Sequence, residues 1–369
     1  MSAARDFISK VNQAYGDGTA GIARRVSRVS SGVVSLDLAL WGGWPRGRSM
    51  LVAGPESSGK TYLAHKLQAQ LNLINWETGE IDPTYSNPTP TCWVDTEGTL
   101  DPVWAEKIGV LNDPDVNVHV LPPHGEAAID IVYDAIVSGS FGAVFLDSVD
   151  AALIQEEQEK SAEEAVVGKK AKAMNSMFRK VTSACNELLK QSRNGEIPAH
   201  RIPLFYAINQ PREQIGVLFG DPSFLPGGKG QKFYSSVLIN MHTAKVSDTS
   251  AKEGGVVTMK GVVKKNKTGM PKETFTFDVA ILNQSEDWMA GTVDNAKALF
   301  PHVKERLMGE KTKEGYPVLD KMFAKQSDIK DELRSNPTFY ERCRKKIFDQ
   351  ILEVVEEGDD EHESSSDSE

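Results

Sequence analysis

Cysteine is scarce in this chain of 369 residues, which contains only Cys92, Cys185 and Cys343. The three are scattered, and no spacing typical of metal ligands joins them. This usage suits a reducing compartment. Cys92 lies in an apolar stretch, where we expect a small buried side chain.

Long apolar runs are also missing. No stretch of about 18 apolar residues exists, so the sequence predicts no membrane span and no membrane partner. Residues 1–7 lack the apolar core of a signal peptide. With 40% apolar and 25% charged residues, the composition predicts one large globular domain with smaller appendages.

An excess of positive charge is absent as well, since the formal net charge is −10. Eight Asp and Glu residues, with no Lys or Arg, lie in residues 356–369, and without them the net charge rises to −2. The rest of the chain is therefore nearly balanced and can still carry a local basic groove. The Ser-rich acidic tail is predicted to be disordered.

The most informative stretch that the sequence does contain is a glycine-rich loop. It fits G-x-x-x-x-G-K-[ST], the phosphate-binding P-loop, and consists of Gly54, Pro55, Glu56, Ser57, Ser58, Gly59, Lys60 and Thr61. Residues 49–53 before it predict a buried strand, and residues 61–72 after it predict an amphipathic helix. This context favours a P-loop over an incidental glycine-rich turn.

The residue types of this loop suit phosphate. The glycines allow backbone N–H groups to point inward, and the helix N-terminus adds its positive dipole end. Lys60 would reach the β- and γ-phosphates of a nucleotide, and the Thr61 hydroxyl would hold Mg²⁺.

Apolar strands alternate with helices through the following residues. Strands are predicted at 91–95, 142–147 and 202–208. The fold class is therefore α/β, with a mostly parallel sheet covered on both faces. Ligands bind at the carboxyl ends of such strands, and Glu97, Asp147 and Gln210 all follow strands there.

Phosphoanhydride hydrolysis needs positioned phosphates, a metal and an oriented water. Asp147 ends an apolar strand in the Walker B pattern and would hold Mg²⁺, directly or through a coordinated water. Glu97 is the best candidate to orient or deprotonate the attacking water. The alternative for both is an acid that merely ends a strand.

Two segments with little periodicity combine cations with apolar side chains. They span residues 155–177 and 211–232, and they suit phosphate neutralisation together with contact to single-stranded bases. The alternative is a pair of ordinary surface loops. The apolar residues considered for base contact are Met174, Ile215, Phe219 and Phe224.

Four regions follow from these patterns. A short helix and linker occupy residues 1–31, the ATPase core residues 32–284, a small helical domain residues 285–355, and the acidic tail residues 356–369. Within the core, antiparallel strands at 237–246, 255–265 and 273–281 extend the sheet. Within the C-terminal domain, helices are predicted at 290–308, 318–323 and 338–355.

Several of these motifs recur in the order in which bacterial RecA-type recombinases have them, and the chain resembles that family from about residue 29 to residue 277. The matching stretches are 54–61, Asp95-Thr96-Glu97, 100–102, 146–149, 208–210, Gly227-Gly228 with 232–234, and 265–267. The resemblance implies a RecA-type P-loop ATPase core and an N-terminal oligomerisation helix. It implies an ATP- and Mg²⁺-dependent recombinase that forms helical filaments on single-stranded DNA, pairs them with homologous duplex and exchanges strands in recombinational DNA repair.

The resemblance also implies roles for residues. Glu97 would be the catalytic acid, Asp101 and Trp104 would contact adenine, and Gln210 would sense the γ-phosphate. Lys265 and Lys267 would reach the neighbouring subunit's ATP, and Phe233 would lie at that interface. Two DNA-binding loops would span 155–172 and 211–231. The DNA-binding candidates are Lys169, Lys170, Lys172, Arg179, Arg212, Ile215, Gly227 and Gly228.

Departures from the family pattern exist. Trp104 stands where the family usually has Tyr, and Lys172 stands where Arg is common. Residues 224–226, Phe-Leu-Pro, make the second loop more apolar than usual.

The expected partners are single- and double-stranded DNA, further copies of the chain, and loader or single-strand-binding proteins. The expected location is a bacterial or phage-infected cytoplasm. A ring helicase and a non-catalytic DNA-binding regulator remain as alternatives.

Overall fold

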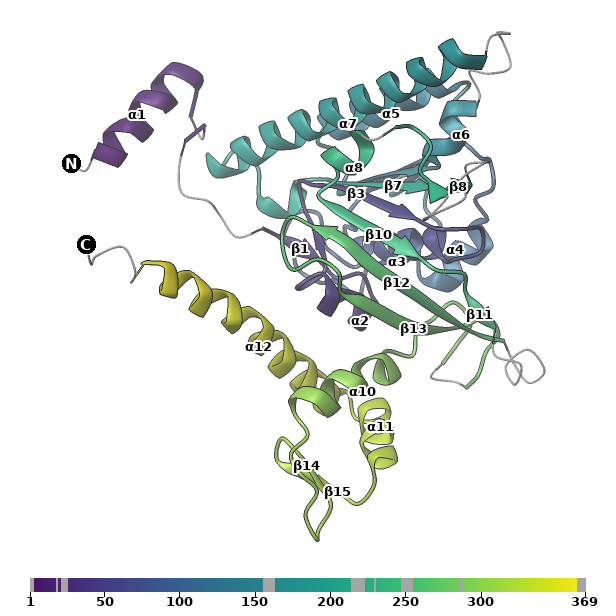
Figure 1. Cartoon of the computed structure of the whole chain (residues 1–369), viewed down its shortest axis with the longest axis vertical. Helices are drawn as coiled ribbons and strands as arrows, with labels where there is room; N and C mark the ends of the chain where they lie inside the picture. Colours follow the sequence, from purple (N-terminus) through teal and green to yellow (C-terminus); the bar gives the residue numbers. More distant parts are fainter. Residues whose placement is uncertain are drawn as a thin grey trace.

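The computed structural model of the chain describes residues 3–17, 19–20, 26–154, 163–213, 223–228, 230–246, 255–285 and 288–363. In this part of the chain, a large twisted sheet lies between two layers of helices (Figure 1). A smaller domain formed by the C-terminal helices lies beyond one end of the sheet (Figure 1). No described helix is both long enough and apolar enough to span a membrane.

Six neighbouring strands of the nine-stranded sheet pair in parallel, from β10 to β5. β12 joins β10 antiparallel, and it also pairs antiparallel with β11 and with β13. In spatial order the strands are β11 (Lys245–Val246), β12 (Val256–Asn266), β10 (Val237–Met241), β3 (Ser49–Ala53), β7 (Leu204–Asn209), β6 (Ala143–Asp147), β4 (Thr91–Asp95) and β5 (Asn117–Val120), with β13 (Thr274–Ala280) beside β12.

The predicted α/β fold with a mostly parallel sheet is confirmed. The prediction that residues 237–246 belong to the antiparallel strands is wrong in one detail. Residues 237–241 form β10, which pairs in parallel with β3 and, on its other side, antiparallel with β12. This strand therefore belongs to the parallel set.

The apolar residues of the strands alternate between two cores. On β3, Met50 and Val52 pack with the helices of one face, whereas Leu51 packs with those of the other. Successive side chains of a strand point to opposite faces, so a strand covered on both sides is apolar at every position. This explains why β3 is buried throughout.

The helices form two layers around this sheet. α2 (Val34–Ala39) and α3 (Lys60–Asn72) contribute to one core, and α5 (Gly125–Val137), α6 (Val149–Ile154) and α7 (Glu163–Arg193) contribute to the other. The remaining elements of the first 240 residues are α1 (Ala3–Tyr15), β1 (Arg28–Val29), β2 (Trp44–Pro45), α4 (Pro102–Ile108), the 3₁₀ turn η2 (Ala199–Arg201), β8 (Arg212–Glu213), β9 (Ser223–Phe224) and α8 (Gly230–Tyr234).

The long helix α7 corrects two expectations. It begins at residue 163, so residues 163–172 of the predicted first DNA loop are helical. Met174 is fully buried in the core between α7 and the sheet, and the expectation that it contacts bases is wrong. Its 3.6-residue spacing with other buried residues, Met177, Phe178 and Val181, places it on the inner face of the helix.

The N-terminal helix α1 stands to one side of the body (Figure 1). Where it ends, Lys190 Nζ of α7 donates a hydrogen bond to the Tyr15 carbonyl at 3.3 Å, and Asn194 Nδ2 donates one to the Asp17 carbonyl at 2.8 Å. Phe7 and Tyr15 are 66% and 72% exposed. These apolar side chains are thus not covered within the described part of this subunit.

The C-terminal domain contains α10 (Asn295–Arg306), β14 (Tyr316–Val318), β15 (Lys321–Phe323), α11 (Gln326–Ser335) and α12 (Pro337–Glu363). The prediction of a helix at 318–323 is wrong. These residues form the end of the first strand, the turn and the second strand of the antiparallel hairpin β14–β15. Leu319 adopts a φ of 54° in this tight turn, a conformation that a helix does not allow. α12 continues to Glu363, into the segment for which a disordered tail is predicted.

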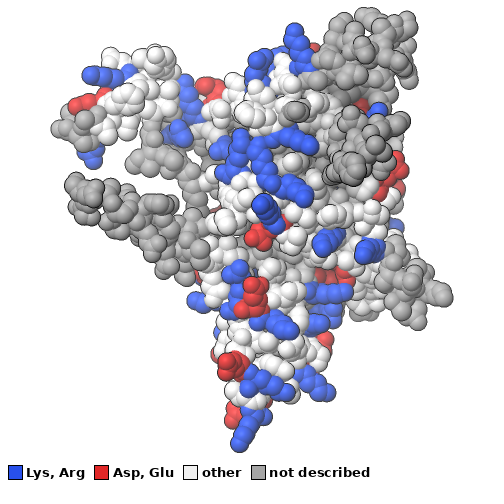
Figure 2. All heavy atoms as spheres, in the orientation of Figure 1, with Lys and Arg blue, Asp and Glu red and all other residues white. Residues whose placement is uncertain are grey.

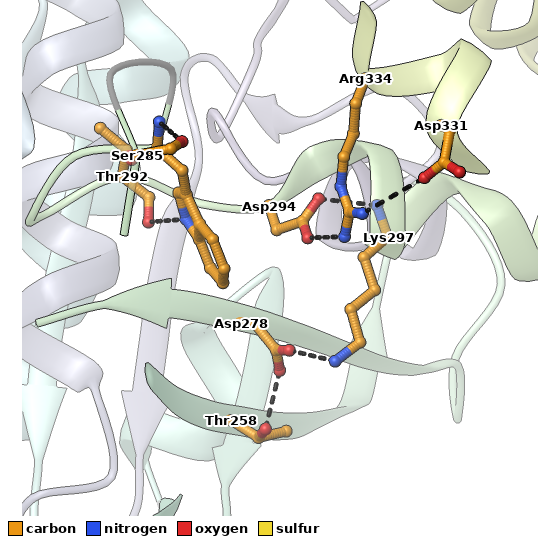
Figure 3. A network of polar contacts seen from close by, with 9 residues as sticks. Thr258, Asp278, Ser285, Thr292, Asp294, Lys297, Asp331 and Arg334 are labelled. Atoms are coloured by element: carbon orange, nitrogen blue, oxygen red, sulfur yellow. Dashed lines mark hydrogen bonds and ion pairs between the residues drawn. The ribbon is translucent and has the colours of Figure 1, made fainter. Parts of the chain in front are cut away.

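Polar contacts join this domain to the sheet (Figure 3). The buried Asp278 of β13 accepts a hydrogen bond from Thr258 at 2.7 Å and pairs with Lys297 of α10. The buried Asp294 caps α10 and pairs with Arg334 of α11 at 2.6 Å. Because each buried carboxylate has its own cation, the two pairs fix the orientation of α10 and α11 on β13.

Candidate nucleotide and nucleic-acid site

The P-loop connects the carboxyl end of β3 to the first turn of α3. Gly59 has a φ of +90°, and a Cβ atom there would lie 2.4 Å from the Met259 sulfur. Both the left-handed backbone and the close approach of Met259 therefore require glycine at this position. Met259 of β12 therefore packs directly against the loop at Gly59.

Two polar groups of the P-loop lack ordinary partners. Within the described part of the chain, Ser58 Oγ is buried and makes no hydrogen bond, and Lys60 Nζ donates to the Pro55 carbonyl of the same loop, at 2.6 Å, and to no other described group. Burial lowers the pKa of Lys60, and the carboxylates of Asp147, Glu97 and Glu56 raise it. A buried donor and a buried ammonium with spare hydrogen-bonding capacity are what a phosphate group would satisfy.

Asp147 ends β6 opposite the P-loop. Thr61 Oγ1 donates a hydrogen bond to its Oδ2 at 3.1 Å. Burial raises the pKa of Asp147 to about 7, and the nearby charges of Glu97 and Asp95 contribute to the increase. A nearby cation stabilises the ionised form of a carboxylate that is buried in this way. The Thr61–Asp147 pair therefore suits a divalent metal ion.

Glu97 lies in the same cleft, where Ser148 Oγ donates a hydrogen bond to its Oε1 at 2.6 Å. A single cleft of about 290 Å³ is lined by residues 56–62 together with Glu97, Asp147 and Gln210. The structure thus brings together the P-loop and the three polar residues that follow separate strands.

The loop that carries Glu97 is held by Asp95, a residue of a family-matching stretch to which the sequence assigned no role of its own. Its buried carboxylate accepts backbone hydrogen bonds from Glu97 (3.0 Å), Gly98 (2.7 Å) and Leu100 (3.2 Å). His119 Nε2 of β5 lies 3.2 Å from Asp95 Oδ2. The only sequence signal for this anchor is an acid two residues before Glu97, at the end of a strand.

Gln210 is connected to the second predicted DNA loop through its neighbour. Asn209 is fully buried, and its Nδ2 donates to the Pro226 carbonyl at 3.0 Å and to Gln231 Oε1 at 2.8 Å. Its Oδ1 accepts from the Gln210 backbone at 2.9 Å. A polar chain therefore leads from the cleft to Pro226 and to Gln231. Asn209 and Gln231 lie in stretches singled out from the sequence, but the sequence assigned neither residue a role.

The other predicted nucleotide residues lie outside this cleft. Asp101 is the N-cap of α4 and accepts backbone hydrogen bonds from Val103 and Trp104. Trp104 is partly buried against the main core. Lys265 Nζ donates to the carbonyls of Lys232 and Phe233, at 2.8 and 2.9 Å, and does not line the cleft of its own subunit.

The exposed Lys267 and the 72% exposed Phe233 lie near Lys265, because Lys265 contacts Phe233 directly and Lys267 follows two residues later. The Lys267 charge contributes to a lowered pKa of Lys265, after burial. Lys265, Lys267 and Phe233 therefore lie together on a surface outside the nucleotide cleft.

The predicted DNA-binding residues are only partly described. Arg212 pairs with Asp150 at 2.8 Å, and Lys172 and Arg179 are exposed on α7. Gly227 and Gly228 have φ values of 90° and 80°. Lys169 and Lys170 belong to α7, but their side chains lie outside the described structure, as does all of Ile215.

Lys and Arg side chains are spread widely over the face shown in Figure 2, with acidic residues among them. Lys and Arg outnumber Asp and Glu among the described residues of this face. Both signs of charge are therefore present in the described part of this face.

The cleft contains the P-loop, the strand-terminal Asp147, which accepts a hydrogen bond from Thr61 of that loop, and a second acid, Glu97. These features define a nucleotide hydrolase of the α/β P-loop class. The model of the RecA N-terminal domain matches residues 3–284. The chain is 35% identical to Protein RecA of Halalkalibacterium halodurans over 69% of this chain and 65% of that protein. It is 35% identical to Protein RecA of Bacillus licheniformis over 77% and 76%, and 30% identical to that of Staphylococcus epidermidis over 98% and 95%.

The chain therefore belongs to the RecA family. It is a RecA-type recombinase and a DNA-dependent ATPase, a protein that binds nucleotide and DNA and oligomerises. Family membership favours this function over the ring-helicase and regulator alternatives.

Proposed function

We propose that the chain hydrolyses ATP with Mg²⁺ while it assembles as a helical filament on single-stranded DNA, and that this filament exchanges strands with homologous duplex. The observation that supports this most is the meeting of the P-loop, Glu97, Asp147 and Gln210 in one cleft. Residues from four strands converge there because parallel strands end at the same edge.

Within this site, the P-loop backbone and Lys60 would bind the β- and γ-phosphates. Thr61 and Asp147 would hold Mg²⁺, which supplies charge neutralisation on the phosphates when bound. Among the described residues no cluster of three or more His, Cys, Asp or Glu side chains forms a metal site. This fits Mg²⁺, which uses one or two carboxylates together with phosphate oxygens and water.

Glu97 would take a proton from the attacking water, and Ser148 keeps its carboxylate in place through the 2.6 Å hydrogen bond. Asp95 would fix the loop of Glu97. Gln210 would contact the terminal phosphate and, through Asn209, bias the conformation of residues 226–231. Asp101 and Trp104 would contact the adenine.

DNA would be bound by residues 155–172 and 211–231, through the cations and glycines predicted for them. Arg212 would leave Asp150 for a phosphate. Further partners would be loader and single-strand-binding proteins, in the cytoplasm of a bacterium or of a phage-infected host. The helix α1, with exposed Phe7 and Tyr15, would dock on the next subunit.

The direct test is ATP hydrolysis with and without single-stranded DNA, followed by electron microscopy. We expect hydrolysis to be strongly stimulated by the DNA and regular helical filaments to form with ATP. Stimulated hydrolysis by closed rings would favour a ring motor, and unstimulated hydrolysis without filaments would contradict the proposal.

Lys265 and Lys267 are expected to act on the ATP of the neighbouring subunit, since Lys265 points to Lys232 and Phe233 and not into its own cleft. A Lys265→Ala/Lys267→Ala variant and a Lys60→Ala variant should each be nearly inactive. Mixed filaments place an intact P-loop beside intact lysines, so partial recovery of ATP hydrolysis is expected. Light-scattering or pull-down assays would first verify that mixed filaments form, and complete lack of recovery in them would then exclude a shared site.

A further inference from the structure

A second group of cations lies at the opposite end of the sheet from the P-loop. A cleft of about 110 Å³ is lined by three arginines, Arg46, Arg48 and Arg193. Arg48 immediately precedes β3, whereas the P-loop follows the same strand. The lining residues come from the segment just before β1, from the turn before β3, from the end of α7 and from the region of the 3₁₀ turn η2.

The turn that carries two of these arginines is rigid. The Arg46 backbone N–H donates to the Ser27 carbonyl at 2.8 Å, the Gly47 N–H donates to Pro203 at 3.0 Å, and the Arg48 carbonyl accepts from Phe205 at 3.2 Å. The backbone positions from which the two arginine side chains extend are therefore fixed before any ligand arrives.

Arg46 is the most unusual of the three. It is only 3% exposed, and its side chain makes one long hydrogen bond, 3.4 Å, to the Ile202 carbonyl. A guanidinium has five N–H donors and stays charged at neutral pH. Burial lowers the pKa of Arg46 to about 10, which still leaves the group protonated near pH 7.

No carboxylate lines the described cleft, whose remaining lining residues are Val26, Ser27, Leu189, Ser192, Ala199 and Ile202. Burial lowers the pKa of Arg48, and the charge of Arg193 contributes to this decrease, so like charges face one another here. The buried Arg46 thus has no carboxylate among the described lining residues, and a buried cation in that situation is costly to the fold. An anion in the cleft would remove that cost.

We propose that the cleft formed by Arg46, Arg48 and Arg193 binds a phosphate group. Guanidinium groups match the oxygens of a phosphate with paired hydrogen bonds. The volume is well below the roughly 300 Å³ at which ligand pockets for whole small molecules begin, so a nucleoside would not enter. The phosphate is either free inorganic phosphate or one group of a nucleic-acid backbone.

The test uses inorganic phosphate and thermal unfolding. A Lys60→Ala background removes the strongest phosphate contact of the P-loop, so that a response reports the arginine cleft. Phosphate is compared with chloride at equal ionic strength. We expect phosphate to raise the unfolding temperature saturably, on the order of 3 °C at tenfold excess over its dissociation constant.

Adding Arg46→Met should abolish this rise, whereas Arg306→Met, the same change at an exposed position of α10, should leave it intact. Equal rises in both double variants, or no phosphate-specific rise in the Lys60→Ala parent, would overturn the proposal.

Unfolding without phosphate supplies a second readout. Arg46→Met keeps an apolar side chain of similar length and removes the uncompensated charge, so the unfolding temperature in chloride should stay equal or rise. A large decrease in chloride would mean that Arg46 stabilises the fold by itself, and the proposal would fail.

The source of the phosphate is identified with Arg46→Met in the otherwise native chain. Binding of a labelled single-stranded oligonucleotide is measured over a range of salt concentrations. If a backbone phosphate occupies the cleft, the slope of log affinity against log salt should fall by about one. An unchanged slope together with the phosphate-dependent stabilisation assigns the cleft to free phosphate.

Discussion

Replacing Lys60 by Ala is expected to reduce ATP hydrolysis at least about 100-fold and to abolish strand exchange. Among the residues that the structure describes, Lys60 is the only Lys or Arg that lines the cleft; the residue is 6% exposed, and its ammonium donates a hydrogen bond to the Pro55 carbonyl. Without this charge, the β- and γ-phosphates lose their main electrostatic contact. Steady-state phosphate release, with and without single-stranded DNA, measures the effect.

Lys107→Ala is the matched control, because Lys107 is exposed on α4 and lies outside the cleft. That variant should hydrolyse ATP normally. Near-normal hydrolysis by the Lys60→Ala protein itself would show that the loop at 54–61 does not bind the reacting phosphates.

Replacing Glu97 by Gln should lower the hydrolysis rate by about 10²–10⁴-fold while ATP binding is retained. The amide oxygen of Gln can still accept the hydrogen bond from Ser148, so the side chain should keep its position. The amide cannot accept a proton from water. Loss of the Glu97 charge also removes one of the causes that raise the pKa of Asp147.

The measurement separates binding from turnover, with ATP affinity by equilibrium titration and hydrolysis by single-turnover kinetics. DNA filaments should persist because ATP stays bound. Glu106→Gln, the same change at an exposed position of α4, controls for the altered net charge. An ATP affinity that decreases as much as the rate would make Glu97 a binding residue.

Much of the cleft could be predicted from local sequence. Lys60, Thr61 and Asp147 belong to motifs whose spacing reflects one strand, one turn and one helix, and the structure brings Thr61 and Asp147 to 3.1 Å. Glu97 and Gln210 could be placed nearby because both follow buried strands. A parallel sheet brings such strand ends to one edge, whichever residues fill the helices.

The supporting contacts could not be predicted in the same way. Asn209 joins Gln231 at 2.8 Å across 22 residues, and Asp95 meets His119 across 24. These pairings depend on the strand order and on the direction of the side chains, and a local sequence pattern predicts neither. The cluster of Arg46, Arg48 and Arg193 is also a product of packing, since α7 ends beside the turn that precedes β3.

Predictions from the local sequence pattern were wrong at two places, where packing or strand pairing decided the structure instead. Met174 follows several lysines, which suggested a surface segment, but the inner face of α7 buries it against the sheet. Residues 318–323 have helix-compatible composition, but a tight turn at Leu319 and pairing between Tyr316 and Phe323 form a hairpin.

By itself, then, the sequence determined the α/β class, the P-loop and the set of strand-end polar residues, because each depends on periodicity and spacing over a few residues. Only the tertiary structure decided which of those residues share a cleft, which carbonyls Lys265 contacts and where Arg46 is buried. These outcomes depend on contacts between segments far apart in the chain, and burial places the Arg46 charge where no described lining residue is a carboxylate.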